Sequence, residues 1–257
     1  LKEWLGERSQ AGRLAPRGDP MALAEALTAK KEALYELSYS TGATKADSWI
    51  DIDGGIGTFA VYQGKGRREL PNDTMLIDGA VEEMSRNGTF KGLHVYTSRQ
   101  GVAVHINAFN FPVWGMLEKL APTFLAGVPA IVKPASATSY LTEAAVRIML
   151  DANVLPAGAL QLIVGSTGDL FEHLESQDVV SFTGSAQTAA KLKSHPVVAR
   201  ETVRFVAEQD SLNASVLGHD ATPESPEFEL FIKEVVKEMT VEAVQKCTAI
   251  RRAFVPA

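Results

Sequence analysis

The single cysteine of the sequence, Cys247, is the side chain best suited to covalent chemistry. It lies in the run Gln245-Lys246-Cys247-Thr248, ten residues before the last residue. A lone thiol forms no intramolecular disulfide and supplies no thiolate-rich metal cage. It is therefore either a nucleophile or an inert core residue, and the inert core residue is the commoner fate of a single cysteine. The polar surroundings and the charge of Lys246, which would stabilise a thiolate, favour the nucleophile.

Two further side chains have types that assist acyl chemistry. Asn110 lies in Asn107-Ala108-Phe109-Asn110-Phe111-Pro112. Its amide can donate a hydrogen bond to a developing oxyanion, or it can cap the helix that Pro112 begins. Glu208 follows a mostly apolar run. In low-dielectric surroundings its pKa would rise toward that of a usable general base; alternatively, Glu208 pairs with a nearby basic residue.

Two motifs are of a kind that binds phosphate or ribose groups. Lys133, in Val132-Lys133-Pro134, can bind ribose hydroxyls or phosphate, or can be a solvated surface lysine. The run Phe182-Thr183-Gly184-Ser185 ends a strand and begins a helix, whose free N–H groups and dipole suit an anion; alternatively, it is an ordinary capped helix start. The Gly54–Gly57 cluster is not interpreted as a phosphate loop, because no buried strand precedes it.

These residues need a sheet to position them, and the pattern from residue 101 onward predicts one. Short apolar runs predict strands at 101–106, 128–132, 160–164, 179–182 and 202–206. Helical segments alternate with them, at 112–126, 138–152, 168–175 and 185–194. This alternation is typical of an α/β fold with a Rossmann-like parallel sheet and helices on both faces. Ligands of such sheets bind at the carboxyl ends of the strands, where the candidate residues lie.

The remaining segments are expected to frame this domain. A helix is predicted at 20–38, and residues 41–100 are expected to be less regular, with a turn-rich stretch at 64–92. We expect residues 1–100 to form an N-terminal helical and irregular arm that packs on a cofactor domain of residues 101–257. A helix at 226–240 carries an apolar face, and the run 253–255 begins a further element.

Composition excludes several classes of function. The 257 residues suffice for one large domain, and 46% are hydrophobic. A net charge of −6 leaves no basic stripe for nucleic acid, and no apolar run reaches the roughly 20 residues that cross a bilayer. The five histidines are scattered without metal-site spacing, so no metal is expected. One cysteine and no export signal favour a reducing, cytoplasmic setting.

Taken in order along the chain, the motifs resemble those of the aldehyde dehydrogenase superfamily. Phe109–Pro112 resembles its Trp-Asn-Phe-Pro element, and Val132–Pro134 resembles its Lys-Pro nucleotide contact. Phe182–Ser185 matches its Phe-Thr-Gly-Ser signature, and Gln245–Cys247 resembles its Gly-Gln-x-Cys nucleophile. The similarity runs from about residue 38 to the end. The resemblance implies a cofactor-binding domain that binds NAD(P) through Ile106, Ala108, Phe109, Lys133, Ser136, Gly165, Phe182, Thr183, Gly184 and Ser185.

The resemblance also implies the catalytic roles. The Cys247 thiolate would attack the aldehyde carbon, Asn110 would hold the oxyanion, and Glu208 would activate the water that releases the acid. The similarity is greatest to the aldehyde dehydrogenase part of ring-opening enzymes of phenylacetate degradation, and a semialdehyde dehydrogenase of the benzoyl-CoA pathway is a sibling alternative. These relatives imply a CoA-linked semialdehyde substrate and NADP, with NAD possible. Ser136, where many NAD-preferring relatives carry glutamate, agrees with NADP.

Three departures from the family pattern keep alternatives open. Val244 stands where the family usually has glycine. A β-branched residue is costly there if the backbone needs a positive φ. Residues 1–37 match poorly. In the family, a catalytic domain and an oligomerisation strand follow the nucleophile, and neither lies within these 257 residues. The alternatives are a truncated, weakly active nucleotide-binding or partner-binding module, and an unrelated Rossmann-like protein with an inert cysteine.

Overall fold

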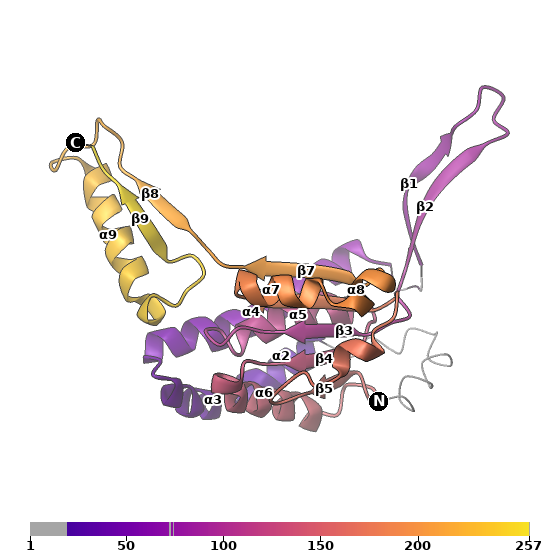
Figure 1. Ribbon diagram of the computed structural model, residues 1–257, viewed down its shortest axis with the longest axis horizontal. Helices are drawn as coiled ribbons and strands as arrows, with labels where there is room; N and C mark the ends of the chain where they lie inside the picture. Colours follow the sequence, from indigo (N-terminus) through magenta and orange to yellow (C-terminus); the bar gives the residue numbers. More distant parts are fainter. Residues whose placement is uncertain (1–19, 72, 74, 257) are drawn as a thin grey trace.

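The structure, a computed structural model, describes residues 20–71, 73 and 75–256 (Figure 1). Of the expected N-terminal arm, residues 1–19 therefore lie outside the described residues. The helical layer before the sheet comprises α2 (Pro20–Ala29), α3 (Lys31–Ser38), η2 (Tyr39–Thr41) and α4 (Lys45–Glu69). The helices between the strands are α5 (Trp114–Leu125), η3 (Ser136–Thr138), α6 (Ser139–Asp151), η4 (Leu170–His173), α7 (Ala186–Lys193) and α8 (Pro196–Arg200).

Five parallel strands form the central sheet, as the apolar runs predict. They are β3 (Ala103–Ile106), β4 (Ala130–Lys133), β5 (Leu160–Leu162), β6 (Val179–Gly184) and β7 (Arg204–Gln209). Their spatial order is β5-β4-β3-β6-β7, and every neighbouring pair is parallel. The register aligns Ile106 with both Lys133 and Phe182. Parallel pairing thus brings the carboxyl ends of three strands into one row.

Helices cover both faces of this sheet, because alternate side chains of each strand point to opposite faces. On one face, Ala130 and Val132 pack with buried residues of α2 to α6. On the other face, Ile131 and Val180 pack with buried residues of η4, α7 and α8. The two apolar clusters therefore lie on either side of a single strand layer, and the predicted α/β fold is confirmed.

Helix α4 corrects the expectation that residues 41–100 are less regular than the rest of the chain. It runs for 25 residues, begins at a capping box between Thr44 and Asp47, and contains the Gly54–Gly57 cluster. A Cβ on Gly54 would lie 2.6 Å from the Trp114 ring, and a Cβ on Gly55 would lie 2.8 Å from the Trp114 Cα. These two glycines therefore let α4 approach α5 closely, which is why they stand inside a helix.

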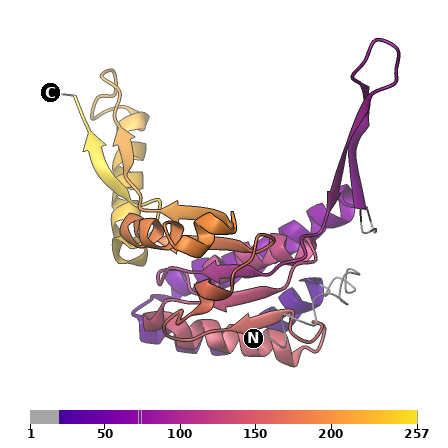
Figure 2. The same cartoon turned by 45° about the vertical axis from the view of Figure 1, so that its right-hand side comes forward.

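Two units project from the sheet domain, and both views place them at opposite ends of it (Figures 1 and 2). One is an antiparallel hairpin of β1 (Met75–Glu83) and β2 (Lys91–Thr97), in part of the stretch expected to be turns. The other consists of β8 (Asn213–Val216), α9 (Pro226–Thr240), η5 (Val241–Val244) and β9 (Ile250–Phe254), in which β8 and β9 pair in parallel. Helix α9 has the predicted bounds, and the second unit carries Cys247.

Candidate active site

Asn110 lies in the loop between β3 and α5, which side chains of other elements hold in place. The Asp51 carboxylate, from α4, accepts the N–H groups of Val113 and Trp114, at 3.2 and 2.8 Å. From α6 and the turn before it, Thr142 donates to Pro112 O at 2.9 Å and Thr138 donates to Phe109 O at 3.1 Å. Helix α5 begins at Trp114, so Asp51 and not Asn110 caps it. The capping alternative for Asn110 is therefore wrong.

The Asn110 amide instead reaches the segment that carries the cysteine. Its Nδ2 donates a hydrogen bond of 2.8 Å to the carbonyl oxygen of Gln245, two residues before Cys247. A primary amide has two N–H donors, so one hydrogen remains for another acceptor. The structure thus brings the predicted oxyanion donor to the predicted nucleophile segment across 135 residues of sequence.

Cys247 is exposed, and its surroundings raise rather than lower the thiol pKa. Partial burial of the sulfur is the main cause, and the negative charge of Glu208 adds to it, because both disfavour the thiolate. Lys246 does not serve the thiol as predicted. Its Nζ lies 2.7 Å from Glu238 Oε1, so its charge is paired within the same unit. These surroundings therefore disfavour ionisation of Cys247.

Glu208 lies near the carboxyl end of β7, beside the end of β6. The strands align it with Thr183, whose hydroxyl donates to Glu208 Oε2 at 3.4 Å. The side chain is exposed, so the low-dielectric surroundings expected from the apolar run do not occur. Its charge nevertheless contributes to the raised thiol pKa of Cys247, which places the carboxylate within electrostatic reach of the sulfur.

The predicted cofactor residues gather along the carboxyl edge of the sheet. Ile106, Lys133 and Phe182 form one row across three strands. The Lys133 ammonium donates to the Pro134 carbonyl at 3.0 Å, and burial lowers its pKa. The others follow the strand ends, with Ala108 and Phe109 after β3, Ser136 exposed in η3, Gly165 after β5, and Thr183, Gly184 and Ser185 at the end of β6 and the start of α7.

This edge has features that fit a dinucleotide. Gly165 has a φ of +104°, with open space where a side chain would stand. Asn107 is buried directly after β3, and neither polar atom of its side chain has a hydrogen-bond partner among the described residues. A buried amide without partners needs a further polar group, such as one from a ligand. Lys133 supplies a positive charge in the same row.

The start of α7 is less open than the phosphate prediction requires. Ser185 caps the helix by accepting the N–H of Thr188, and Asp210 Oδ1 accepts the N–H of Ala186 at 3.0 Å. Both amides are thus bonded within the chain, as in an ordinary capped helix start. An anion bound at the Ala186 N–H would have to displace the Asp210 carboxylate.

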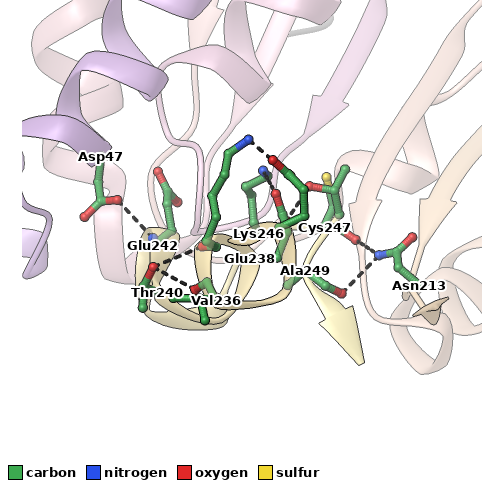
Figure 3. Close-up of polar contacts among 12 residues, drawn as sticks. Asp47, Asn213, Val236, Glu238, Thr240, Glu242, Lys246, Cys247 and Ala249 are labelled. Carbon is green, nitrogen blue, oxygen red and sulfur yellow. Dashed lines mark hydrogen bonds and ion pairs between the residues drawn. The ribbon is translucent and has the colours of Figure 1, made fainter. Parts of the chain in front are cut away.

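Four positioning side chains were not identified from the sequence: Asp47, Asp51, Asn213 and Glu238 (Figure 3 shows all but Asp51). Asn213 Nδ2 donates to the carbonyl of Cys247 at 2.6 Å, and Glu238 accepts from Lys246 and Thr248. Asp47 Oδ1 accepts the N–H of Glu242 at 2.9 Å. The Thr44-x-x-Asp47 spacing of a capping box was a readable signal for Asp47, but nothing local points to the others.

The departure at Val244 has a structural counterpart. Glu242, Ala243 and Val244 all have positive φ, at +51°, +49° and +68°. Val244 thus occupies the left-handed region that favours glycine, so the condition under which valine is costly at this position is met. Three such residues in succession, none of them glycine, immediately precede Gln245 and the nucleophile.

Within the ranges that the structure describes, no group of three or more His, Cys, Asp or Glu side chains could hold a metal ion. The same ranges contain no helix with the length and apolarity that a membrane span requires.

The sheet, its helical layers and the polar groups at its carboxyl edge define a Rossmann-like α/β protein. The family profile described as "Aldehyde dehydrogenase family" matches residues 19–257, so the similarity begins earlier than residue 38. The chain belongs to the aldehyde dehydrogenase family. It is 46% identical over 237 residues to 3,4-dehydroadipyl-CoA semialdehyde dehydrogenase of Aromatoleum evansii, covering 92% of this chain and 46% of that protein.

Solved structures agree on the fold. Betaine aldehyde dehydrogenase from Staphylococcus aureus, in complex with NAD+, has 25% identity and a TM-score of 0.77, covering 93% of this chain and 45% of that one. Succinic semialdehyde dehydrogenase from Streptococcus pyogenes, in complex with NADP+, has 19% identity and a TM-score of 0.77, covering 99% and 52%. The chain therefore spans about half the length of the relatives that it matches.

Proposed function

We propose that this chain supplies the cofactor-binding and nucleophile-bearing part of an NADP-dependent aldehyde dehydrogenase, with Cys247 as the nucleophile. The observation that carries the proposal is the hydrogen bond from Asn110 to Gln245, because it joins the loop after β3 to the cysteine segment. Among the sequences compared, the relative at 46% identity acts on a CoA semialdehyde, and we propose a CoA-linked semialdehyde as the substrate.

In the proposed reaction, the Cys247 thiol gives its proton to solvent, and the thiolate bonds to the aldehyde carbon as the carbonyl electron pair moves to oxygen. The second N–H of Asn110 and the Cys247 backbone N–H hold the resulting oxyanion. Bound NAD(P)+ supplies a hydride acceptor, and the carbon then remains attached to sulfur as a thioester. Glu208 takes a proton from water, the water oxygen bonds to that carbon, and the carbon–sulfur bond breaks to release the acid. The exposed position of Glu208 gives it access to water.

Single-turnover chemistry tests this proposal. The chain is titrated with NADP+ to establish binding, then mixed with a CoA-linked semialdehyde. In samples quenched before hydrolysis we expect a first equivalent of NADPH and an acyl adduct on Cys247 by intact mass, with neither in Cys247→Ser. Equal NADPH formation by Cys247→Ser would contradict the nucleophile. Binding of NADP+ with no adduct and no NADPH would contradict the reaction while leaving the cofactor site standing.

The preference for NADP is proposed from Ser136, which lies exposed after β4 and places no carboxylate near a 2′-phosphate. Substituting Ser136→Glu adds a like charge, and we expect it to weaken NADP+ binding by about tenfold while changing NAD+ binding little. The matched control is Ala137→Glu, which adds the same charge at the next exposed residue. Equal losses for both variants, or none for Ser136→Glu, would contradict the assignment.

A second candidate is a module that binds a partner subunit. It is favoured by exposed apolar side chains of α9, including Ile232, Val236 and Met239. Mixing the chain with a full-length homologue and measuring mass by light scattering tests it. Unchanged masses would count against this candidate.

A further inference from the structure

The turn before the nucleophile, residues 242–244, has a conformation that it would not keep by itself. All three residues have positive φ and none is glycine, so each is held in a sparsely populated region. Such a backbone persists only where surrounding contacts fix it. The question is therefore which contacts hold this turn.

Three hydrogen bonds from outside the turn meet it or the residue after it. Asp47 Oδ1 accepts the Glu242 N–H, Arg251 Nη2 donates to the Val244 carbonyl at 2.8 Å, and Asn110 donates to the Gln245 carbonyl. Arg251 belongs to the same projecting unit as the turn. Asp47 belongs to α4, in the helical layer of the sheet domain, and reaches the turn across 195 residues of sequence. Its carboxylate points at the backbone nitrogen of Glu242 (Figure 3).

The two oxygens of Asp47 have separate partners. Oδ2 accepts the N–H and hydroxyl of Thr44, at 2.9 and 2.7 Å, and so completes the capping box of α4. Oδ1 remains for Glu242. The side chain is only 8% exposed. Burial opposes its ionisation, but these hydrogen bonds outweigh it and hold the pKa of Asp47 below its usual value. The carboxylate therefore keeps its charge while it anchors the turn.

The Glu242 side chain cannot take over this role by charge attraction. Burial, with the neighbouring charges of Asp51 and Asp47, raises its pKa to about 8, while Lys246 opposes that rise. A carboxyl group among carboxylates is repelled when ionised. The contact between α4 and the turn therefore depends on the backbone N–H of Glu242.

We propose that Asp47 is a positioning residue for the nucleophile: it anchors the left-handed turn 242–244 to α4 and thereby sets Cys247 relative to Asn110 and Glu208. This role rests on the proposed function of Cys247. It does not require Asp47 to touch substrate or cofactor.

Alkylation of Cys247 by iodoacetamide tests the role directly, because the chain has no other cysteine. The alkylation rate of the thiol is measured across a range of pH in wild type and in three variants: Asp47→Ala, Thr44→Val and the double variant Asp47→Ala with Val244→Gly. With the anchor removed, the thiol moves into water and away from Glu208. Its pKa then falls toward the ordinary value. We expect alkylation at neutral pH to be several-fold faster in Asp47→Ala than in wild type.

The other two variants separate positioning from general destabilisation. Thr44→Val weakens the same helix cap but leaves the Asp47–Glu242 contact, so the wild-type alkylation profile is expected. Glycine at 244 keeps a positive φ without the anchor, so Val244→Gly is expected to slow alkylation in the Asp47→Ala background. Equal acceleration by Thr44→Val, or no slowing by Val244→Gly, would overturn the proposal.

If Asp47→Ala does not fold, Asp47→Asn replaces it. The amide has a single acceptor oxygen, whereas in wild type Thr44 donates to one carboxylate oxygen and the Glu242 N–H donates to the other. Alkylation faster than wild type in the folded protein supports the anchor, and a wild-type rate overturns it. These readouts need neither aldehyde nor cofactor. A failed acyl-adduct experiment therefore leaves the alkylation result interpretable. A failed alkylation test likewise leaves the acyl-adduct experiment interpretable.

Discussion

The sheet domain and the unit that carries the nucleophile are held by different interactions. In the sheet domain, a cluster of buried apolar side chains lies on each face of the sheet, although the edge strand β7 is mostly exposed. In the unit from β8 to β9, the buried residues among those described are Leu217, Ala249 and the charged Glu238. Hydrogen bonds and one ion pair hold the cysteine segment there. Burial thus builds the domain, whereas directional polar contacts place the thiol.

The largest expected effect tests the apolar side of this contrast. Phe59, on α4, is fully buried and packs edge-on against Phe124, with ring centroids 6.4 Å apart. Phe59→Ala leaves a cavity in the domain core, and we expect the free energy of unfolding to fall by about 3–5 kcal/mol. Urea unfolding followed by circular dichroism measures it.

The matched control lies two residues away on the same helix. Val61 is 69% exposed, and Val61→Ala is expected to change the free energy of unfolding by less than about 0.5 kcal/mol. Similar losses for the two variants would mean that burial in α4 does not dominate the stability of this domain.

The second effect concerns the charges at the junction of the two regions. Burial raises the pKa of Asp51 from 3.8 to about 7, although the N–H groups of Trp114 and Val113 oppose the rise. Between these values the folded chain keeps a proton that the unfolded chain has lost. Asp51 by itself therefore lowers the free energy of unfolding as pH rises from about 4 to 7, by an amount on the order of 4 kcal/mol, and Glu242 adds to this fall. Urea unfolding at a series of pH values measures the slope.

Two variants assign that slope. In Asp51→Asn one oxygen can still accept from Val113 and Trp114 and no proton is exchanged, so we expect a flatter profile. Glu242→Gln removes the neighbouring group whose pKa is raised from 4.5 to about 8, and should flatten the profile between about pH 4.5 and 8, including the part above pH 7 to which Asp51 adds little. An unchanged slope in Asp51→Asn would show that this carboxyl group is not the source.

The same contrast explains how far the sequence could be interpreted. Continuous apolar runs predicted the five parallel strands, and helical spacing of apolar residues predicted α9, whose apolar side chains are nevertheless largely exposed. Helix α4 was missed because its glycines are explained by close packing against Trp114, which is distant in sequence. The hairpin β1–β2 was missed because it is mostly exposed on both faces and shows no alternation.

At the site, motif order predicted which residues lie together but not which contacts hold them. Asn110 was found from its motif. That it does not cap α5 became clear only from Asp51, which accepts the Val113 N–H and lies 62 residues away in the sequence. Lys246 was misinterpreted because its partner, Glu238, comes from the preceding helix. At Val244 the motif drew attention to a position where a positive φ would be costly for valine, and the structure shows that φ is positive there. Polar contacts between distant segments leave no periodic trace, so most of them needed the structure.

The third effect tests how closely the two helices at the site must approach. A Cβ on Gly55 would lie 2.8 Å from the Trp114 Cα and 3.1 Å from its nitrogen, and backbone atoms yield little. Gly55→Ala is therefore expected to cost about 1–3 kcal/mol of unfolding free energy. Gly57, on the same helix, has nothing within 4 Å of such a Cβ. Gly57→Ala should stabilise the chain by about 0.5–1 kcal/mol. Thermal unfolding of both variants gives the comparison, and a loss in Gly57→Ala would refute it.

The smallest effect lies in the polar unit itself. Val244 is held at a φ of +68°, which costs a β-branched residue about 1–2 kcal/mol, whereas glycine adopts it freely but loses about 0.5–1 kcal/mol through its more flexible unfolded chain. Val244→Gly should therefore raise the free energy of unfolding by up to about 1.5 kcal/mol, measured as the urea midpoint. Val216→Gly, at an exposed position of β8 in the same unit, gains no such relief and should lower it. Equal losses in the two variants would mean that the side chain of Val244 stabilises the turn more than its backbone strains it, and apolar contacts would then share in placing the nucleophile.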